Sequence, residues 1–219
     1  MIEVRNVTKR YAGKRAVDAL RGVSFRVEKG EMVATMGPSG SGKSTLLNII
    51  GGLDRPSEGS VIIDGIDLQA LDDKGLTRLR REKIGFVFQF FNLLPTLTAL
   101  ENVALPLHLD GAARKKAVTR AAEMLERMGL KERQDHLPDE LSGGEQQLVA
   151  MARALVLGPP LILADEPTGN LDSINGQEIL SLLKKLQSEF GTTLIVVTHD
   201  SRAAGFCDRI LNMQDGQIV

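Results

Sequence analysis

Residues 37–44 read Gly37-Pro38-Ser39-Gly40-Ser41-Gly42-Lys43-Ser44, and they match the pattern G-x-x-x-x-G-K-[ST]. The apolar run 32–36 before them predicts a strand, and 43–50 predicts the helix that follows. Glycines let a loop bend tightly enough for its N–H groups to surround phosphate oxygens, and a helix N-terminus adds positive potential. The stretch predicts a phosphate-binding loop, with Lys43 reaching the β- and γ-phosphates and the Ser44 hydroxyl ligating Mg²⁺. The alternative is a merely flexible glycine loop.

A second candidate element lies at 161–166, where an apolar run ends in Asp165 and Glu166. A buried strand would place both carboxylates at the C-terminal edge of a sheet, where open α/β sheets bind ligands. In phosphoryl-transfer sites one acid holds Mg²⁺ and a second group activates water. Asp165 fits the metal role and Glu166 the role of the base, although an acidic strand end can also cap the next helix.

Two further polar residues follow predicted strands. His199 comes directly after the run 194–198, and Gln89 after the run 84–88. At the same sheet edge, His199 would contact the γ-phosphate and orient the attacking water, and Gln89 would offer an amide oxygen to Mg²⁺. Taken alone, each residue is more simply interpreted as an ordinary loop residue.

Composition excludes several classes of protein. The 219 residues include 27 basic and 28 acidic side chains, for a net charge of -1, which gives no electrostatic footprint for nucleic acid. Cys207 is the only cysteine, so the chain forms no internal disulfide and offers no thiol-rich metal site, as suits a reducing cytoplasm. No signal peptide and no apolar run of about 18 residues is present, so we expect a soluble chain.

The remaining patterns predict an α/β fold. Continuous apolar runs at 84–88, 161–164 and 194–198 are typical of strands buried on both faces of a parallel sheet. The segments 23–27 and 32–36 predict strands joined by a turn at 28–31. Between strands lie helical patterns such as 113–128, whose apolar positions are Val118, Ala121, Leu125 and Met128. We expect one domain, 1–219, with a core of 1–89 and 143–219 and a mostly helical insertion at about 90–142.

Leu141-Ser142-Gly143-Gly144-Glu145 lies between the phosphate loop and the Asp165–Glu166 pair. By itself it predicts only a helix N-cap with Glu at the third helical position. Together with the other motifs, in this order, it makes essentially the whole chain resemble an ATP-binding-cassette ATPase. That resemblance implies a P-loop NTPase core with a mainly parallel sheet, an N-terminal antiparallel β subdomain and an inserted helical subdomain.

The resemblance also implies roles for individual residues. Tyr11 resembles the aromatic residue that stacks on adenine, Gln89 the Q-loop glutamine and His199 the switch histidine. Residues 141–147 resemble the signature motif and 170–172 the D-loop. The implied assembly is a head-to-tail homodimer in which ATP is bound between the phosphate loop of one subunit and the signature of the other. The nucleotide-binding residues would then be Tyr11, Gly37, Pro38, Ser39, Gly40, Ser41, Gly42, Lys43, Ser44, Thr45, Gln89, Ser142, Gly143 and Gly144.

Within the family the chain is similar to one branch, on the segments 51–56, 89–95, 100–103 and 167–172. The branch contains ATPases of the lipoprotein-releasing, macrolide-exporting and cell-division types. Two departures stand out. Leu148 replaces the usual Arg, which either alters contacts of the signature helix or is a harmless apolar packing change. The chain also ends at Val219, whereas macrolide exporters continue into a membrane domain, so it is a stand-alone subunit or a fragment.

The resemblance implies an ATPase that drives an integral membrane permease from the cytoplasmic face of the inner membrane. Apolar residues after Gln89 are candidates for docking a cytoplasmic helix of that permease, or for packing the helical insertion: Phe90, Phe91, Leu93 and Leu94. The basic residues Arg78, Arg80, Arg81 and Lys83 predict a solvated face. A mechanical switch that moves an envelope protein without transporting cargo remains open, whereas a DNA or ribosome ATPase is disfavoured by the short 44–141 interval and the neutral charge.

Overall fold

The computed structural model describes residues 1–13 and 16–219. Its larger sheet has six strands in the order β10 (Gln217–Ile218), β9 (Arg209–Gln214), β3 (Met32–Met36), β8 (Thr193–Thr198), β7 (Leu161–Asp165) and β6 (Ile84–Val87). Neighbouring strands are parallel, except that β10 pairs antiparallel with β9. This sheet is the mainly parallel core that the sequence predicts.

A second, antiparallel sheet comes from the N-terminal part of the chain. Its order is β2 (Val17–Val27), β1 (Ile2–Tyr11), β4 (Glu58–Ile63) and β5 (Ile66–Asp67). The turn predicted at 28–31 joins two strands that do not pair, because the strand before that turn belongs to this sheet and β3 to the parallel one. The turn therefore carries the chain from one sheet to the other.

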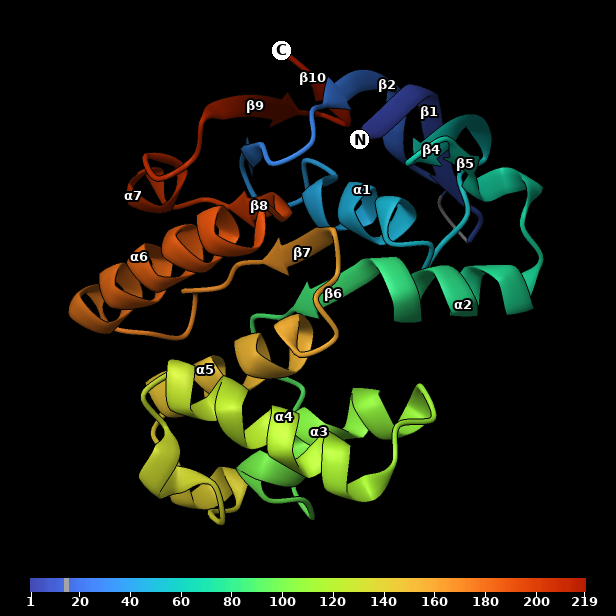
Figure 1. Cartoon of the computed structure of the whole chain (residues 1–219). Coiled ribbons are helices and arrows are strands. Elements are labelled where there is room, and N and C mark those ends of the chain that lie inside the picture. The colour runs from blue at the N-terminus through green and yellow to red at the C-terminus, as the bar shows by residue number, and fades with distance from the viewer. Residues whose placement is uncertain (14–15) are drawn as a thin grey trace.

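The helices cover both faces of the parallel sheet (Figure 1). Helix α1 (Lys43–Ile50) lies between the two sheets, and α2 (Asp73–Lys83) leads from the antiparallel sheet to β6. Helices α3 (Ala99–Leu109), α4 (Arg114–Arg127) and α5 (Gly143–Leu155) gather at the opposite end of the molecule, with 3₁₀ turns at 131–133 and 138–140. Helices α6 (Ser173–Phe190) and α7 (Ser201–Ala204) flank β8, and a further 3₁₀ turn spans 68–70.

The continuous apolar runs are explained by two cores on opposite faces of the parallel sheet. Ile195 and Val197 of β8 face the core that contains α1 and the antiparallel sheet. Leu194 and Val196 face the core that contains α3, α4, α5 and α6. Because successive side chains of a strand point to opposite faces, a strand between two cores needs apolar residues at every position.

Helix α4 fits its predicted bounds, but its buried face is turned slightly from the predicted one. Val118 is 36% exposed, whereas Ala117 and Met124 are buried beside Ala121 and Leu125. The apolar stripe therefore follows the i, i+4, i+7, i+8 spacing of a helix that packs on one side. No helix in the described part of the chain is long and apolar enough to cross a bilayer.

Candidate functional site

The phosphate loop lies between β3 and α1, as its pattern predicts. Gly40 and Gly42 have left-handed backbones, with φ of 80° and 102°. At Gly42 a Cβ atom would come within 2.4 Å of the Ala19 carbonyl oxygen, so only glycine fits there. No side chain caps the N-terminus of α1. Its first N–H groups are therefore left to an anion, which is the physical requirement of a phosphate site.

Lys43 is buried and folds back over this loop. Its ammonium nitrogen Nζ donates to the carbonyl oxygens of Gly37 at 2.7 Å and Pro38 at 2.9 Å. Ser41 is also buried, and its hydroxyl has no hydrogen-bond partner among the described residues. The loop thus concentrates a cation and unpaired donors at one point, as binding of a polyanion requires.

Asp165 ends β7 beside the start of α1. The Ser44 hydroxyl donates to Asp165 Oδ1 at 3.2 Å, although the two residues are 121 positions apart in the sequence. Burial raises the pKa of Asp165, the neighbouring Glu166 raises it further, and Ser44 and Lys43 oppose the shift. A carboxylate that is costly to ionise in the protein alone, with a hydroxyl beside it, suits a hard cation such as Mg²⁺.

Glu166 and His199 meet at the ends of the adjacent strands β7 and β8. His199 Nδ1 lies 2.8 Å from Glu166 Oε1, and the Thr198 hydroxyl donates to Glu166 Oε2 at 3.2 Å. The Glu166 backbone has φ of 45°, an unfavourable left-handed conformation, and its N–H donates to the Val197 carbonyl. The sequence predicts that Glu166 and His199 lie at one sheet edge, but not their direct contact or the contribution of Thr198.

Gln89 follows β6 and contacts the loop after Glu166. Its carbonyl oxygen accepts from Asn170 Nδ2 at 2.8 Å, and its amide Nε2 lies 3.5 Å from Asn170 Oδ1. The order β6-β7-β8 brings Gln89, the acidic pair and His199 to one edge of the parallel sheet. This edge is where the sequence predicts them, because carboxyl ends of parallel strands meet there.

Tyr11, at the end of β1, stands near α1. The residue is 42% exposed, and its hydroxyl donates to Asp54 Oδ2 at 2.8 Å. Burial and Asp54 raise the Tyr11 pKa, against a hydrogen bond with Thr45. Lys9 lies 4.8 Å from the ring centroid and pairs with Asp54. The sequence gives no signal for Asp54, 43 positions away, whereas Lys9 lies two residues before Tyr11 on β1.

Ser142, Gly143 and Gly144 open α5 on the other face of the sheet. The Ser142 hydroxyl accepts from the Glu145 N–H at 3.3 Å, and Glu145 Oε2 accepts from the Ser142 N–H at 2.8 Å, which confirms the predicted capping box. Helices α5 and α1 belong to different cores. The structure therefore does not bring these three residues to the phosphate loop of their own chain.

Leu148 packs against the core of the helical end of the molecule, half-buried between α5 and α6. The structure favours the packing explanation for this departure.

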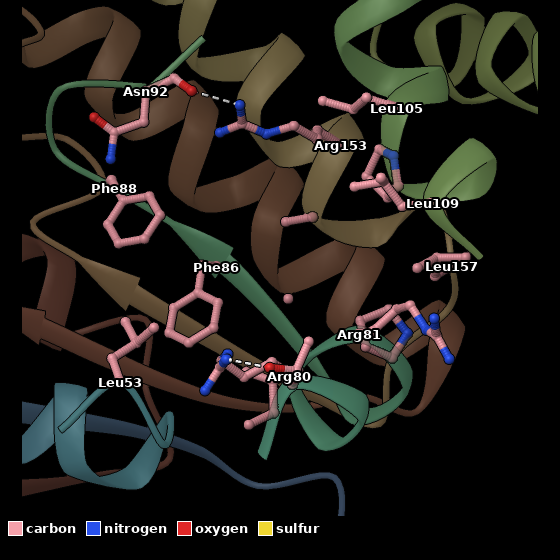
Figure 2. Close-up of a pocket in the computed structure, with 16 residues that line it drawn as sticks. Leu53, Arg80, Arg81, Phe86, Phe88, Asn92, Leu105, Leu109, Arg153 and Leu157 are labelled. Atoms are coloured by element: carbon pink, nitrogen blue, oxygen red, sulfur yellow. Dashed lines mark hydrogen bonds between the residues drawn. The ribbon is translucent and has the colours of Figure 1, made fainter. Parts of the chain in front are cut away.

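A cavity of about 630 Å³ opens between α2, β6, α3 and α5 (Figure 2). Arg80 lines it and donates to the Gly52 carbonyl at 2.7 Å, so the predicted solvated face is wrong for this half-buried residue.

The family model for the ABC transporter matches residues 20–169. The chain belongs to the ABC transporter family. An uncharacterized ABC transporter ATP-binding protein of Methanocaldococcus jannaschii is 55% identical over 100% of this chain and 95% of its own length. A dimeric structure of that ATP-binding cassette in a post-hydrolysis state, with ADP and Pi, has a TM-score of 0.92 at 52% identity and covers 100% of this chain and 96% of its own.

Two relatives represent the branch that the sequence resembles. The lipoprotein-releasing system ATP-binding protein LolD of Geobacter metallireducens is 49% identical over 100% of this chain and 98% of its own length. The macrolide export ATP-binding/permease protein MacB of Rhodopirellula baltica is 48% identical over 100% of this chain but only 32% of its own length. This ABC transporter chain is therefore an ATP-binding subunit and an ATPase.

Proposed function

We propose that this chain binds Mg·ATP, closes around it as a homodimer and drives an integral membrane permease of the export or lipoprotein-extraction type. The observation that carries the proposal is the pairing of Glu166 with His199 and Thr198, directly beside the Ser44–Asp165 pair. A base, a histidine and two hard oxygen ligands at one sheet edge are the parts that phosphoryl transfer to water needs.

The triphosphate would lie on the loop and the N-terminus of α1. Backbone N–H groups of 39–45 would surround it, and Lys43 would exchange its two carbonyl partners for phosphate oxygens. The Tyr11 ring would stack on the adenine, held at its hydroxyl by Asp54. A half-exposed aromatic ring with a fixed edge is suited to such a contact because it loses little freedom on binding.

Mg²⁺ would be held by Ser44, Asp165 and the amide oxygen of Gln89. Oxygen donors fit Mg²⁺, which prefers hard ligands and retains several waters. When bound, the ion would offset the negative charge of the phosphates. The Gln89 side chain would then turn its oxygen toward the ion, in place of its present approach to Asn170.

Hydrolysis would use Glu166 as the base that takes a proton from the attacking water. His199 would hold the Glu166 carboxylate through Nδ1 and leave its other ring nitrogen for the γ-phosphate. The Glu166 side chain is only 14% exposed, whereas that of His199 is 70% exposed. The base is therefore sheltered, and the histidine stands where a ligand or a second subunit can reach it.

Closure would involve Ser142, Gly143 and Gly144 of a second copy. These residues open α5 on the face opposite α1, so a head-to-tail dimer would let each copy complete the other's site. Their N–H groups and the Ser142 hydroxyl would meet the γ-phosphate at a helix N-terminus. The dimeric post-hydrolysis structure of the Methanocaldococcus jannaschii cassette supports this arrangement.

The permease would dock on the segment after Gln89 and on the adjoining cavity between α2, β6, α3 and α5, which Asn92 of that segment lines, on the cytoplasmic face of the inner membrane. Phe90 is 73% exposed and Leu94 is 43% exposed on the segment after Gln89, whereas Leu93 packs into the core. We propose that residues 90–142 form a helical subdomain that moves with ATP and transmits force to the permease. The relatives named LolD and MacB support a transport function.

The test is to trap Glu166→Gln with Mg·ATP in native cells, solubilise the membranes gently and identify what co-purifies. We expect a polytopic membrane protein, whose periplasmic part would distinguish transport from a mechanical switch without cargo. Recovery of ribosomes or DNA, or of a trapped dimer with no partner, would contradict the membrane assignment.

A further inference from the structure

The turn after Gln89 has an unfavourable backbone. Phe91 and Asn92 are consecutive residues with positive φ, 58° and 50°. Asn tolerates this left-handed conformation, but Phe adopts it rarely because its Cβ crowds the backbone. Such a conformation persists only where surrounding contacts hold it.

One side chain of α5 provides those contacts. Arg153 donates from Nη1 to the Asn92 carbonyl at 2.6 Å (Figure 2). It also donates from Nη2 to the Phe91 carbonyl at 2.8 Å. Within the described residues Arg153 forms no ion pair, and burial lowers its pKa. The two carbonyls compensate a half-buried cation, and the planar guanidinium fork lets one side chain bond to both.

The same turn also lies close to the other end of α5. A Cβ atom on Gly143 would lie 3.9 Å from the Phe91 ring and 3.7 Å from Leu171. Gly143 and Arg153 are ten residues apart, about 15 Å along a helix. Arg153 therefore bonds the turn to α5, and the Phe91 ring lies beside the first residue of the same helix.

On its other side the turn continues into Gln89. The Gln89 backbone is tied to Asn170, and a Cβ on Gly169 would meet the Gln89 amide at 2.9 Å. Gln89 is therefore held between the loop after Glu166 and the turn that Arg153 clamps. A change in the hydrogen bonds from Arg153 to the turn would therefore displace Gln89, which lies only two residues before Phe91.

We propose that Arg153 is a positioning residue that sets Gln89 over the Mg·ATP site by clamping the turn at Phe91 and Asn92. Because Arg153 and the signature residues belong to the same helix, a movement of α5 would shift the turn and, with it, the Gln89 amide. Arg153 and Asn92 also line the cavity of about 630 Å³, so an occupant of that cavity acts on the same clamp. This inference rests on the proposed contact of Gln89 with the metal–nucleotide complex.

The experiment compares Arg153→Lys, Gln89→Ala and the double variant of the full chain, with Arg114→Lys as the control on exposed α4. Lysine keeps the charge but cannot form the fork. We expect Arg153→Lys to lower kcat about tenfold and to raise the Mg²⁺ concentration for half-maximal turnover several-fold. The KM for ATP and the Tm should stay close to those of Arg114→Lys.

The double variant decides how Arg153 acts. If it works through Gln89, adding Arg153→Lys to Gln89→Ala lowers kcat less than twofold further, because coupled residues are not additive. Additive losses, or unchanged Mg²⁺ dependence in Arg153→Lys, overturn the inference. Gln89→Ala alone tests the proposed function separately: if it leaves turnover and Mg²⁺ dependence intact, the metal role of Gln89 fails and the inference fails with it.

A second variant covers the case in which Arg153→Lys does not fold. Asn92→Gly makes the same turn more flexible and changes no residue of α5, and glycine accepts the left-handed conformation. We expect a smaller shift of Mg²⁺ dependence in the same direction, absent in the Gln89→Ala background. An unchanged Mg²⁺ dependence in Asn92→Gly would also overturn the inference.

Discussion

His199 Nδ1 lies 2.8 Å from Glu166 Oε1, across 33 residues of sequence. The contact exists because β7 and β8 are parallel neighbours whose carboxyl ends reach the same sheet edge. It leaves the carboxylate sheltered and the imidazole largely open. The proposed division between a base and the residue that orients it follows from this difference.

Replacing the base should separate binding from turnover. In Glu166→Gln we expect ATP binding to persist and kcat to fall about 100-fold or more, because an amide takes no proton from water. A closed dimer should accumulate with Mg·ATP, measured by size-exclusion chromatography. Glu123→Gln, on exposed α4, is the matched control, and undiminished hydrolysis in Glu166→Gln would remove Glu166 from the base role.

Lys43→Ala should instead weaken nucleotide binding itself. Loss of a charge-assisted contact to phosphate is worth about 1.5–3 kcal/mol, so the Kd for ATP should rise by roughly 10- to 100-fold. The measurement is equilibrium binding in the absence of turnover. Lys29→Ala, in an exposed turn, controls for the loss of one positive charge; equal affinities of the two variants would contradict the assignment.

The fluorescence of Tyr11 can report the proposed contact with adenine. Tyr11 is the only tyrosine and the chain has no tryptophan, so tyrosine emission comes from this one ring. We expect ATP to quench it on binding. Tyr11→Ala should raise the Kd roughly tenfold, since stacking of a base on an aromatic ring contributes about 1–3 kcal/mol. Tyr11→Phe keeps the ring and should bind within a few-fold of wild type; an equal loss in both variants would point to the Asp54 hydrogen bond instead.

Docking of the permease should depend on the exposed apolar residues after Gln89. Phe90→Ala and Leu94→Ala should each weaken capture of the membrane partner by the trapped dimer, because a buried aromatic or aliphatic anchor carries much of an interface's affinity. Ile210→Ala is a matched control, since Ile210 is 44% exposed and Leu94 43%. Full capture and stimulation in both docking variants would contradict the proposed surface.

The single thiol should be unreactive in the folded chain. Burial raises the pKa of Cys207 to about 11, from 9.0 in an ordinary environment. At pH 8 the thiolate is then scarcer by on the order of 100-fold than in the unfolded chain, and the reaction with a disulfide reagent should slow accordingly. The unfolded thiol ionises first as pH rises, so this group lowers the stability of the fold between about pH 9 and 11. Equal rates in native and denatured protein would show that the thiol is exposed.

Much of the parallel sheet could be predicted because it requires local signals. Strands buried on both faces need an unbroken apolar run, and the loop at 37–44 needs glycines where no Cβ fits, as at Gly42. The antiparallel sheet was harder to place. The sequence predicts a turn at 28–31 between two strands, and only the pairing of β2 with β1 and of β3 with β8 reveals that this turn joins two sheets.

By itself the sequence determined the chemistry of the site: the phosphate loop, the acidic strand end, and the order of motifs that places the chain in the ABC transporter family. Only the tertiary structure decided which distant groups support them. No local sequence pattern predicts the hydrogen bonds of Thr198 to Glu166, of Tyr11 to Asp54 and of Arg153 to the turn at 91–92. A single side chain can reach its partner from any element that packs nearby. A motif consists of residues that are close in the sequence, whereas the contacts that hold it in place depend on strand order and packing.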